Sequence, residues 1–405
     1  MELWYIRKHY GAEKLWHSYL AYRVQNETEP EVGRYVEIRK IADEFSHESK
    51  ADYKATIDGL CWLALERGAH FPGHKGGWWA YSNRNGKLPN ADLNILSAAA
   101  YFDCIPLARR FLSKICCPTS DNYLFPSPIQ IAAWAGNKDM LALFQEHLPE
   151  FEEIPPRYKN DYTPWLGKTG PGSIKGAALS GDINMLRLAI YPLSRLKADS
   201  ADFCGQNFGQ VSPRSMLGSD LRAALYYVKT AEAFQYIESF FKDSSLLTDS
   251  SRLLAHYTEL GNEEMVRYLL GAGADIHGEN KYNLNPLLIA ARYCHEDIVN
   301  LLLEYGADPN NGKSQQRGSP LYAATAGGSV PIVKKLIDHG AKVDESDWVI
   351  LRQVARLESR AMLDLLLDRN IGSKDSWLRV SRRVTGKGHR ALAKYIQQRT
   401  TELSS

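Results

Sequence analysis

The sequence predicts an all-α protein built as a solenoid, in which short helix pairs follow one another along the chain. Three observations predict this fold class. Residues 285–310 and 319–344 share one pattern of Pro-Leu, two small residues, an apolar pair and Gly-Ala. Related patterns return at intervals of 33 or 34 residues elsewhere in the chain. Their apolar positions have the spacing of amphipathic helices. A fixed period of this length indicates units that bury their apolar faces against their neighbours.

Each position in the repeated pattern has a structural reason. Pro286 opens the first helix, where its missing backbone N–H costs nothing. The small residues Ala290 and Ala291 let neighbouring helices approach closely. Gly306 supplies the left-handed residue that ends the second helix. The apolar stripe of that second helix consists of Ile298, Val299, Leu301 and Leu302.

This pattern resembles the ankyrin repeat, a turn followed by two antiparallel helices of about 33 residues. The resemblance is specific at residues 251–344 and 127–144, and weaker copies extend it over about residues 57–396. It implies an ankyrin-type helical solenoid of about nine partly degenerate repeats, which we expect to occupy residues 51–400. Residues 1–50 do not fit the repeat, and two helical segments there predict an N-terminal helical cap.

The turn between the two helices of each repeat locates the weaker copies. The last two copies, near residues 348–368 and 384–396, have a shorter period of about 30 residues. The predicted turn residues of the other copies are Asp103, Gly136, Gly181, Val228, Gly261 and Cys294.

Three long inserts interrupt the period, at residues 70–90, 150–172 and 197–218. Loops of this length are usually functional or disordered, and low-complexity disorder would lack the aromatic residues found here. We expect the inserts to converge over the N-terminal half and to form one aromatic-lined cleft. The alternative is that each aromatic side chain packs locally and holds its own loop. The candidate ligand-binding residues are Trp78, Trp79, Tyr81, Tyr158, Tyr162, Trp165 and Phe208.

The sequence offers few candidates for catalysis: His74, Lys75, Asp103 and Tyr162. His74 lies four residues after another histidine, but an intervening Pro-Gly excludes a helix and no third ligand is evident, so we predict no metal site. The Gly-Lys-Thr that begins at Gly167 lacks the earlier glycine of a phosphate-binding loop. We predict no cofactor.

Composition and charge narrow the functional class. The 405 residues include 49 basic and 47 acidic side chains, a net charge of +2, which argues against a general nucleic-acid-binding protein. The six cysteines form no C-x-x-C pair, which predicts a reduced, cytoplasmic protein. No stretch approaches the ~18 apolar residues of a membrane span, and the first residues lack the apolar segment of a secretory signal.

Three further features have structural interpretations. The resemblance implies that His295 bonds neighbouring backbone, and Cys204 is expected to be an inert thiol. Residues 374–399 hold eight basic residues, with Asp375 the only acid. We interpret this stretch as the polar outer face of a terminal capping repeat, with a weak anionic partner as the alternative.

The resemblance implies a protein-binding module that acts as an intracellular scaffold or adaptor. Its protein partner would bind the concave groove and the inserted loops, with neither specific nucleic acid nor membrane involved. The alternative is an ankyrin-scaffolded enzyme or small-molecule binder, with a pocket built by the aromatic inserts. For this alternative, the sequence resembles divergent ankyrin-like proteins of filamentous fungi, some of which are encoded beside natural-product pathways.

Overall fold

The protein is helical wherever its structure is described. In these residues every regular element is a helix and there is no strand, which confirms the predicted all-α fold class. The computed structural model describes residues 13–26, 34–69, 91–112, 118–120, 124–148, 172–190, 216–241, 250–280, 282, 284–311, 318–342, 348–386 and 388–402.

The chain forms two compact units, unit 1 (Met1–Asp243) and unit 2 (Ser244–Ser405). The described helices of unit 1 are α2 (Glu13–Asn26), α3 (Arg34–Ser49), α4 (Tyr53–Ala69), α5 (Ala91–Tyr101), α6 (Ile105–Leu112), α7 (Pro128–Ala135), α8 (Lys138–Glu146), α10 (Ser173–Ser180), α11 (Ile183–Ile190), α12 (Met216–Ala224) and α13 (Ala231–Glu238). Those of unit 2 are α14 (Ser250–Leu260), α15 (Glu263–Gly271), α16 (Pro286–Arg292), α17 (Glu296–Glu304), α18 (Pro320–Gly327), α19 (Val330–Asp338), α20 (Trp348–Leu357), α21 (Arg360–Asp368), α22 (Lys374–Gly386) and α23 (Arg390–Glu402).

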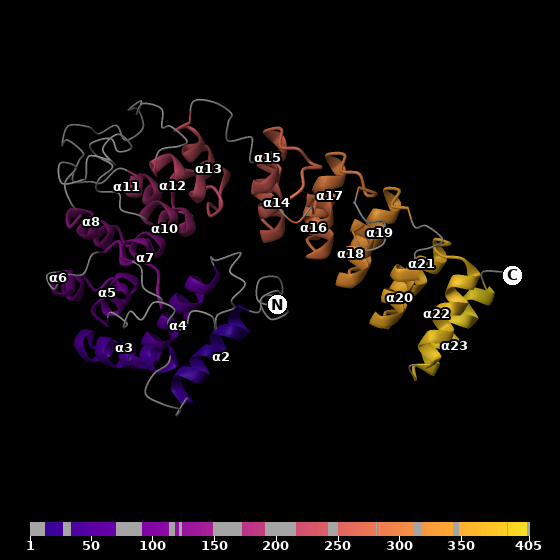
Figure 1. Ribbon diagram of the computed structural model, residues 1–405, viewed down its shortest axis with the longest axis horizontal. Coiled ribbons are helices and arrows are strands. Elements are labelled where there is room, and N and C mark those ends of the chain that lie inside the picture. Colours follow the sequence, from indigo (N-terminus) through magenta and orange to yellow (C-terminus); the bar gives the residue numbers. More distant parts are fainter. Residues whose placement is uncertain are drawn as a thin grey trace. The chain divides into compact units, whose positions relative to one another are not determined.

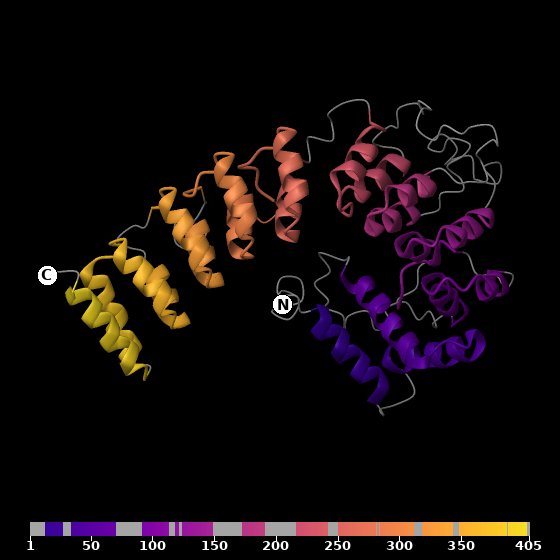
Figure 2. The same ribbon diagram turned by 180° about the vertical axis from the view of Figure 1, so that it is seen from behind.

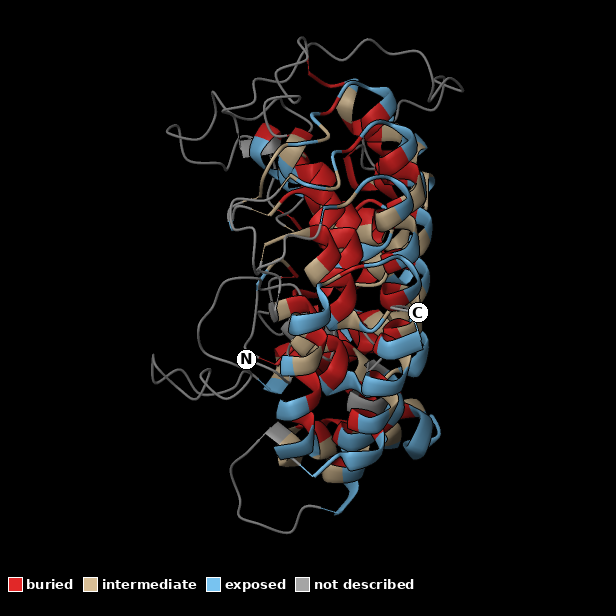
Figure 3. Cartoon of the chain, turned by 90° about the vertical axis from the view of Figure 1, so that its right-hand side faces the viewer, coloured by how far each residue is buried: buried red, intermediate tan, exposed pale blue. Residues whose placement is uncertain are grey.

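Consecutive helix pairs pack in series within each unit. In unit 2 the first helices α14, α16, α18, α20 and α22 contact one another in that order, and so do the second helices α15 to α23 (Figures 1 and 2). In unit 1 the same order holds for α5, α7, α10 and α12. Figure 3 shows the buried residues concentrated between the helices. This arrangement confirms the predicted ankyrin-type helical solenoid, while the number of repeats stays a prediction.

The turn inside each pair requires a left-handed residue. Most of the predicted turn residues have a positive φ, from 54° at Asp103 to 81° at Gly181. Val228 is not among them, because a β-branched residue would be strained there. The later turns place Gly328, Glu358 and Gly388 in the same conformation, at intervals that confirm the short final period.

The helix starts also follow the sequence pattern. Pro286 and Pro320 each lie in the first turn of a helix. The preceding residues cap these helices, since Asn285 Oδ1 accepts a hydrogen bond from Leu288 N at 2.8 Å and Ser319 Oγ accepts one from Tyr322 N at 3.1 Å. Gly306 has a φ of 88° and follows α17, as predicted.

The stack continues past each predicted insert. Helix α4 contacts α5 on either side of residues 70–90, and α7 contacts α10 on either side of residues 149–171. Helices α10 and α12 also contact each other, and α12 begins at Met216, earlier than the predicted end of the third insert. The inserted segments therefore do not interrupt the packing of the helices that flank them.

The N-terminal region contains helices where the sequence predicts them. Helix α2 packs on α3 and α4. The predicted cap boundary at residue 50 lies between α3 and α4, which contact each other, and Lys50 there has a φ of 55°. The separation of cap and solenoid at this point stays a prediction.

Gly176 lies at the closest approach between two helices of unit 1. A Cβ atom at this position would lie 2.1 Å from the backbone oxygen of Gln130 on α7 and 3.1 Å from the Cβ of Ala133. Only hydrogen fits there, so this glycine sets the spacing between α7 and α10.

Two neighbouring residues connect the turns of successive pairs in unit 2. His295 Nε2 lies 3.3 Å from the carbonyl oxygen of Glu259, which confirms the structural role expected for this histidine. Cys294 Sγ lies 3.6 Å from the carbonyl oxygen of Gly327. Burial lowers the pKa of His295, and the hydrogen bond to Glu259 only partly offsets this effect.

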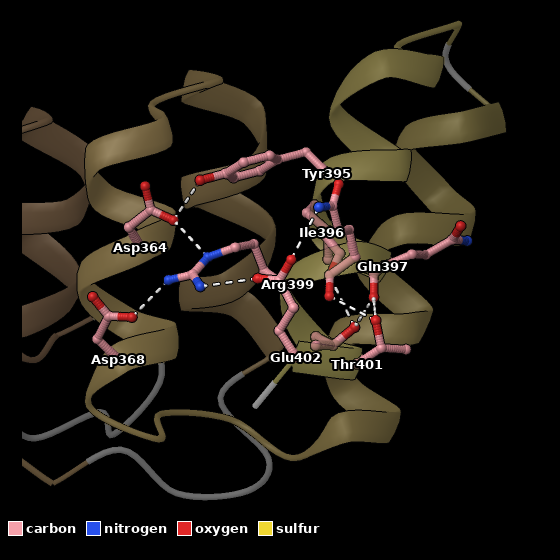
Figure 4. Close-up of polar contacts among 10 residues, drawn as sticks. Asp364, Asp368, Tyr395, Ile396, Gln397, Arg399, Thr401 and Glu402 are labelled. Atoms are coloured by element: carbon pink, nitrogen blue, oxygen red, sulfur yellow. Dashed lines mark hydrogen bonds and ion pairs between the residues drawn. The ribbon is translucent and has the colours of Figure 1, made fainter. Parts of the chain in front are cut away.

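Ionic contacts connect the last helix pair to the pair before it. Arg399 on α23 bonds Asp364 at 3.2 Å and Asp368 at 2.8 Å on α21, and Glu402 on its own helix at 3.2 Å (Figure 4). The Tyr395 hydroxyl donates to Asp364 at 2.5 Å. These contacts fix the orientation of α23 against α21.

We predict that Gly176→Ala destabilises unit 1. The added methyl group would force α7 and α10 apart, which costs about 1–3 kcal/mol, more than the ~1 kcal/mol that alanine adds to helix propensity. Urea unfolding of the full chain measures the free energy of unfolding. Gly271→Ala is the matched control, because a Cβ there meets nothing within 4 Å. Equal stability of the two variants would contradict the close packing.

We predict that His295 makes unit 2 less stable in mild acid. Its pKa is lower in the folded than in the unfolded chain, so its contribution is complete above the unfolded value of about 6.5 and is lost as the pH falls below it. Unfolding measured between about pH 7.5 and pH 5 should show a smaller loss of stability for His295→Gln than for the native chain. Identical pH dependence of the two proteins would refute this role.

Candidate functional site

Most of the predicted site residues lie outside the described residues. They comprise all the candidate ligand-binding residues, Trp78, Trp79, Tyr81, Tyr158, Tyr162, Trp165 and Phe208, together with His74 and Lys75. The aromatic cleft and the catalytic roles of these residues therefore stay predictions.

Asp103 is the one predicted catalytic residue that the structure describes. It is exposed and occupies the turn between α5 and α6, with a φ of 54°. Partial desolvation raises the pKa of its carboxyl group, and the nearby negative charge of Asp139 raises it further. Gly136 occupies the same position in the next pair, and aspartate tolerates this conformation better than most residues. Turn geometry thus gives Asp103 a structural role, while its catalytic role stays a prediction.

Two of the described cysteines, Cys61 and Cys294, do not resemble activated nucleophiles. Burial, and then the negative charge of Asp58, raises the pKa of the Cys61 thiol to about 12. Burial also raises the pKa of Cys294. A raised pKa leaves little thiolate at neutral pH. Across the described residues, no group of three or more His, Cys, Asp or Glu side chains is placed to hold a metal ion.

Three first helices of unit 2, α14, α16 and α20, are followed by a turn that large side chains precede, whereas the equivalent residues of α18 are Ala326 and Gly327. Leu260 on α14 and Leu357 on α20 are exposed, at 46% and 38% of their surface. Tyr293, which follows α16, is half-buried and lies at the position equivalent to these two leucines. In the pairs of α14, α16 and α20 the preceding residue is charged. We call the six residues Glu259, Leu260, Arg292, Tyr293, Arg356 and Leu357 the first-helix row.

Contacts between pairs hold part of this row in place. The Tyr293 hydroxyl donates to Glu259 Oε1 at 3.5 Å, which joins the rows of α14 and α16. The Tyr293 ring also lies 6.2 Å from the ring of His295, centroid to centroid. The row therefore combines apolar surface with charges of both signs on a fixed helical base.

Side-chain amides connect the loops at the opposite ends of these helices. Asn310 donates to the carbonyl oxygen of Gly340 at 3.0 Å and accepts from Lys342 N at 2.7 Å. Asn285 donates to the carbonyl oxygen of Asn311 at 2.6 Å. Tyr282, in the loop before α16, is exposed at 63% of its surface. These bonds fix successive loops relative to one another and leave an aromatic side chain accessible.

The first-helix row is not among the sites that the sequence predicts. Its members stand one and two residues before the turn residues Gly261, Cys294 and Glu358, so the repeat phase locates them once the turns are assigned. Their residue types follow no pattern of their own. The positions of the turn residues are therefore the sequence signal that locates the first-helix row.

In the described part of the chain, no helix is both long and apolar enough to cross a membrane.

Two family models match the chain. The model described as "Ankyrin repeats (3 copies)" matches residues 223–313, and the model described as "Ankyrin repeat" matches residues 318–348. Both matches include helix pairs of unit 2 and follow their phase.

Known proteins are similar to parts of this chain. A fowlpox virus protein whose name describes it as an ankyrin repeat protein is 33% identical over 106 residues, which cover 25% of this chain and 24% of the relative. A protein of Acanthamoeba polyphaga mimivirus with the same description is 33% identical over 86 residues, 21% of this chain and 50% of the relative. A glycerophosphocholine phosphodiesterase of Candida albicans is 33% identical over 91 residues, 22% of this chain and 8% of the enzyme.

These alignments cover half or less of each relative, so the relatives' activities are not carried over to this chain. The repeats indicate a protein-interaction module. Serial packing of the helix pairs, the turn residues in phase and the two matching models agree that the chain contains ankyrin repeats, which the models match at residues 223–313 and 318–348.

Proposed function

We propose that this protein is an intracellular scaffold or adaptor, and that unit 2 binds a protein partner along the first-helix row. The observation that carries the proposal is the placement of exposed leucines and a half-buried tyrosine beside charged residues, at equivalent positions of α14, α16 and α20. Apolar and aromatic anchors surrounded by polar groups are the usual composition of protein interfaces.

The rigidity of unit 2 supports this proposal. Side chains cap the starts of many of its helices, including Asn262, Asn285, Ser319 and Ser359. The amide contacts of Asn310 connect adjacent loops. A surface held in one conformation loses little entropy on binding, so more of the contact energy remains as affinity.

The composition of the row suggests the chemistry of the partner. Leu260, Tyr293 and Leu357 would contact apolar side chains of the partner. Glu259 at one end and Arg356 at the other would favour a partner segment with charges of both signs, in an order that opposes this one. Electrostatic complementarity of this kind would fix the direction in which the partner binds.

Two further observations bear on the cellular setting and on the alternative. Cys61, Cys104 and Cys294 are free cysteines, as expected of a protein in a reducing compartment. The matching repeats favour the scaffold over an enzyme or small-molecule binder. A cleft formed by the aromatic inserts remains a second proposed contact surface for the partner.

We predict that Leu260→Glu combined with Leu357→Glu weakens binding of a partner segment to the row. Peptides selected from a random display library against the full chain provide the probe. Loss of two apolar anchors should raise the dissociation constants of these peptides about tenfold or more. Fluorescence anisotropy with labelled peptides measures the constants.

Tyr305→Glu is the matched control, because Tyr305 is exposed at 47% of its surface and follows the second helix α17. All three positions are exposed, so thermal unfolding should be nearly unchanged. If Tyr305→Glu abolishes peptide binding while the double variant binds normally, the partner contacts another surface and the proposal fails.

A further inference from the structure

The last helix pair concentrates positive charge. Residues 374–399 contain eight Lys and Arg residues and one acidic residue, in a chain whose net charge is +2. Of the residues in this pair, Arg379, Arg382 and Arg383 on α22 are exposed, as are Arg390 and Lys394 on α23. We call these five residues the end face.

Helical spacing gathers the charges on the exposed sides of the two helices. Arg379, Arg382 and Arg383 stand three and four residues apart, so they lie on one face of α22. The opposite face is buried through Trp377, Val380, Ser381 and Val384. On α23, Arg390 and Lys394 are four residues apart, and the buried Leu392, Ala393 and Ile396 lie elsewhere on the helix.

Two positions show that the end face corresponds to a surface that is buried against the next pair in earlier helix pairs of unit 2. Thr385 is exposed, whereas the equivalent Ala291 of α16 is fully buried. Gln397 is also exposed, whereas the equivalent Leu303 of α17 is 8% exposed. Thr385 lies three residues after Arg382, and Gln397 lies three after Lys394. The end face thus surrounds positions that are buried between pairs elsewhere in unit 2.

A solvent-exposed helix surface needs polar residues, but it does not need charges of one sign. Arg399 is not part of the end face, and its guanidinium group reaches Asp364 and Asp368 on α21 (Figure 4). Glu402 accepts from both Arg399 and Gln398. The positive charge of the end face therefore exceeds what a solvent-exposed helix surface requires.

We propose that the end face binds an acidic polypeptide segment rich in Asp and Glu. Four of its five residues are arginines, whose planar guanidinium groups bind carboxylates in a bidentate way. The end face shares no residue with the first-helix row, so it would be a second contact surface, beyond the proposed scaffold function.

Two observations favour a polypeptide over a nucleic acid. Aromatic side chains that could stack on bases are absent from the described end face, because Trp377 is buried and Tyr395 bonds Asp364. In addition, α15 and α17 of the same unit begin with acidic residues, which would repel a long polyanion. These are Glu263, Glu264, Glu296 and Asp297.

The test measures binding of a fluorescein-labelled, glutamate-rich synthetic peptide to the full chain by fluorescence anisotropy at low ionic strength. Arg382→Glu combined with Arg383→Glu should weaken binding about tenfold or more, because two attractive charges become repulsive. Added salt should weaken the native complex. Arg390→Glu with Lys394→Glu is the second variant, and thermal unfolding identifies any variant that does not fold.

Lys334→Glu with Lys342→Glu is the matched control, since both lysines are exposed in unit 2 outside the end face and the net charge changes equally. This control and the Leu260→Glu, Leu357→Glu variant should bind the peptide as the native chain does, which separates the end face from the first-helix row. The proposal is overturned if the native chain does not bind, if the control loses as much affinity as the end-face variants, or if a short DNA duplex of equal charge binds as tightly.

Discussion

Packing between neighbouring helix pairs is the constraint on which the rest of the structure depends. Helices such as α6 and α17 have one apolar face and are too short to be stable alone, so each pair gains its stability from the pairs beside it. This requirement explains the positive-φ residue inside most turns, since the second helix must return beside the first. It also explains Gly176, where the spacing between α7 and α10 leaves room for no side chain.

The same constraint determines which positions keep the same character from one helix pair to the next and which positions vary. Buried positions such as Ala291 and Leu303 are fixed by their neighbours, so they repeat from pair to pair. Positions just before the turns are free to differ, and they carry leucine, tyrosine or charge. Unit 2 therefore has two distinct surfaces. The first-helix row mixes apolar and charged groups, and the end face is basic. A scaffold with two such surfaces could bring together two different partners.

Much of the fold could be predicted from the sequence, because its physical requirements leave a mark at fixed intervals. The turn residues Gly136, Gly261 and Cys294 were located from the period alone, and the start of α16 from Pro286. The first-helix row could not be predicted in the same way, because exposed side chains such as Leu357 are not constrained by packing. The exposure of Thr385 and Gln397 could not be predicted either, because it depends on whether another helix pair covers these positions. The aromatic residues of the inserts, including Trp79 and Trp165, retain only their sequence-based interpretation.

The loops that join successive pairs shorten along unit 2. The connections from α15 to α16 and from α17 to α18 are long, whereas α21 ends at Asp368 and α22 begins soon after, at Lys374. The connections between the first pairs consequently contain more residues than the connection before the last pair. A ligand that contacts these connections would meet more residues at one end of the unit than at the other, which gives the unit a direction that does not depend on its charges.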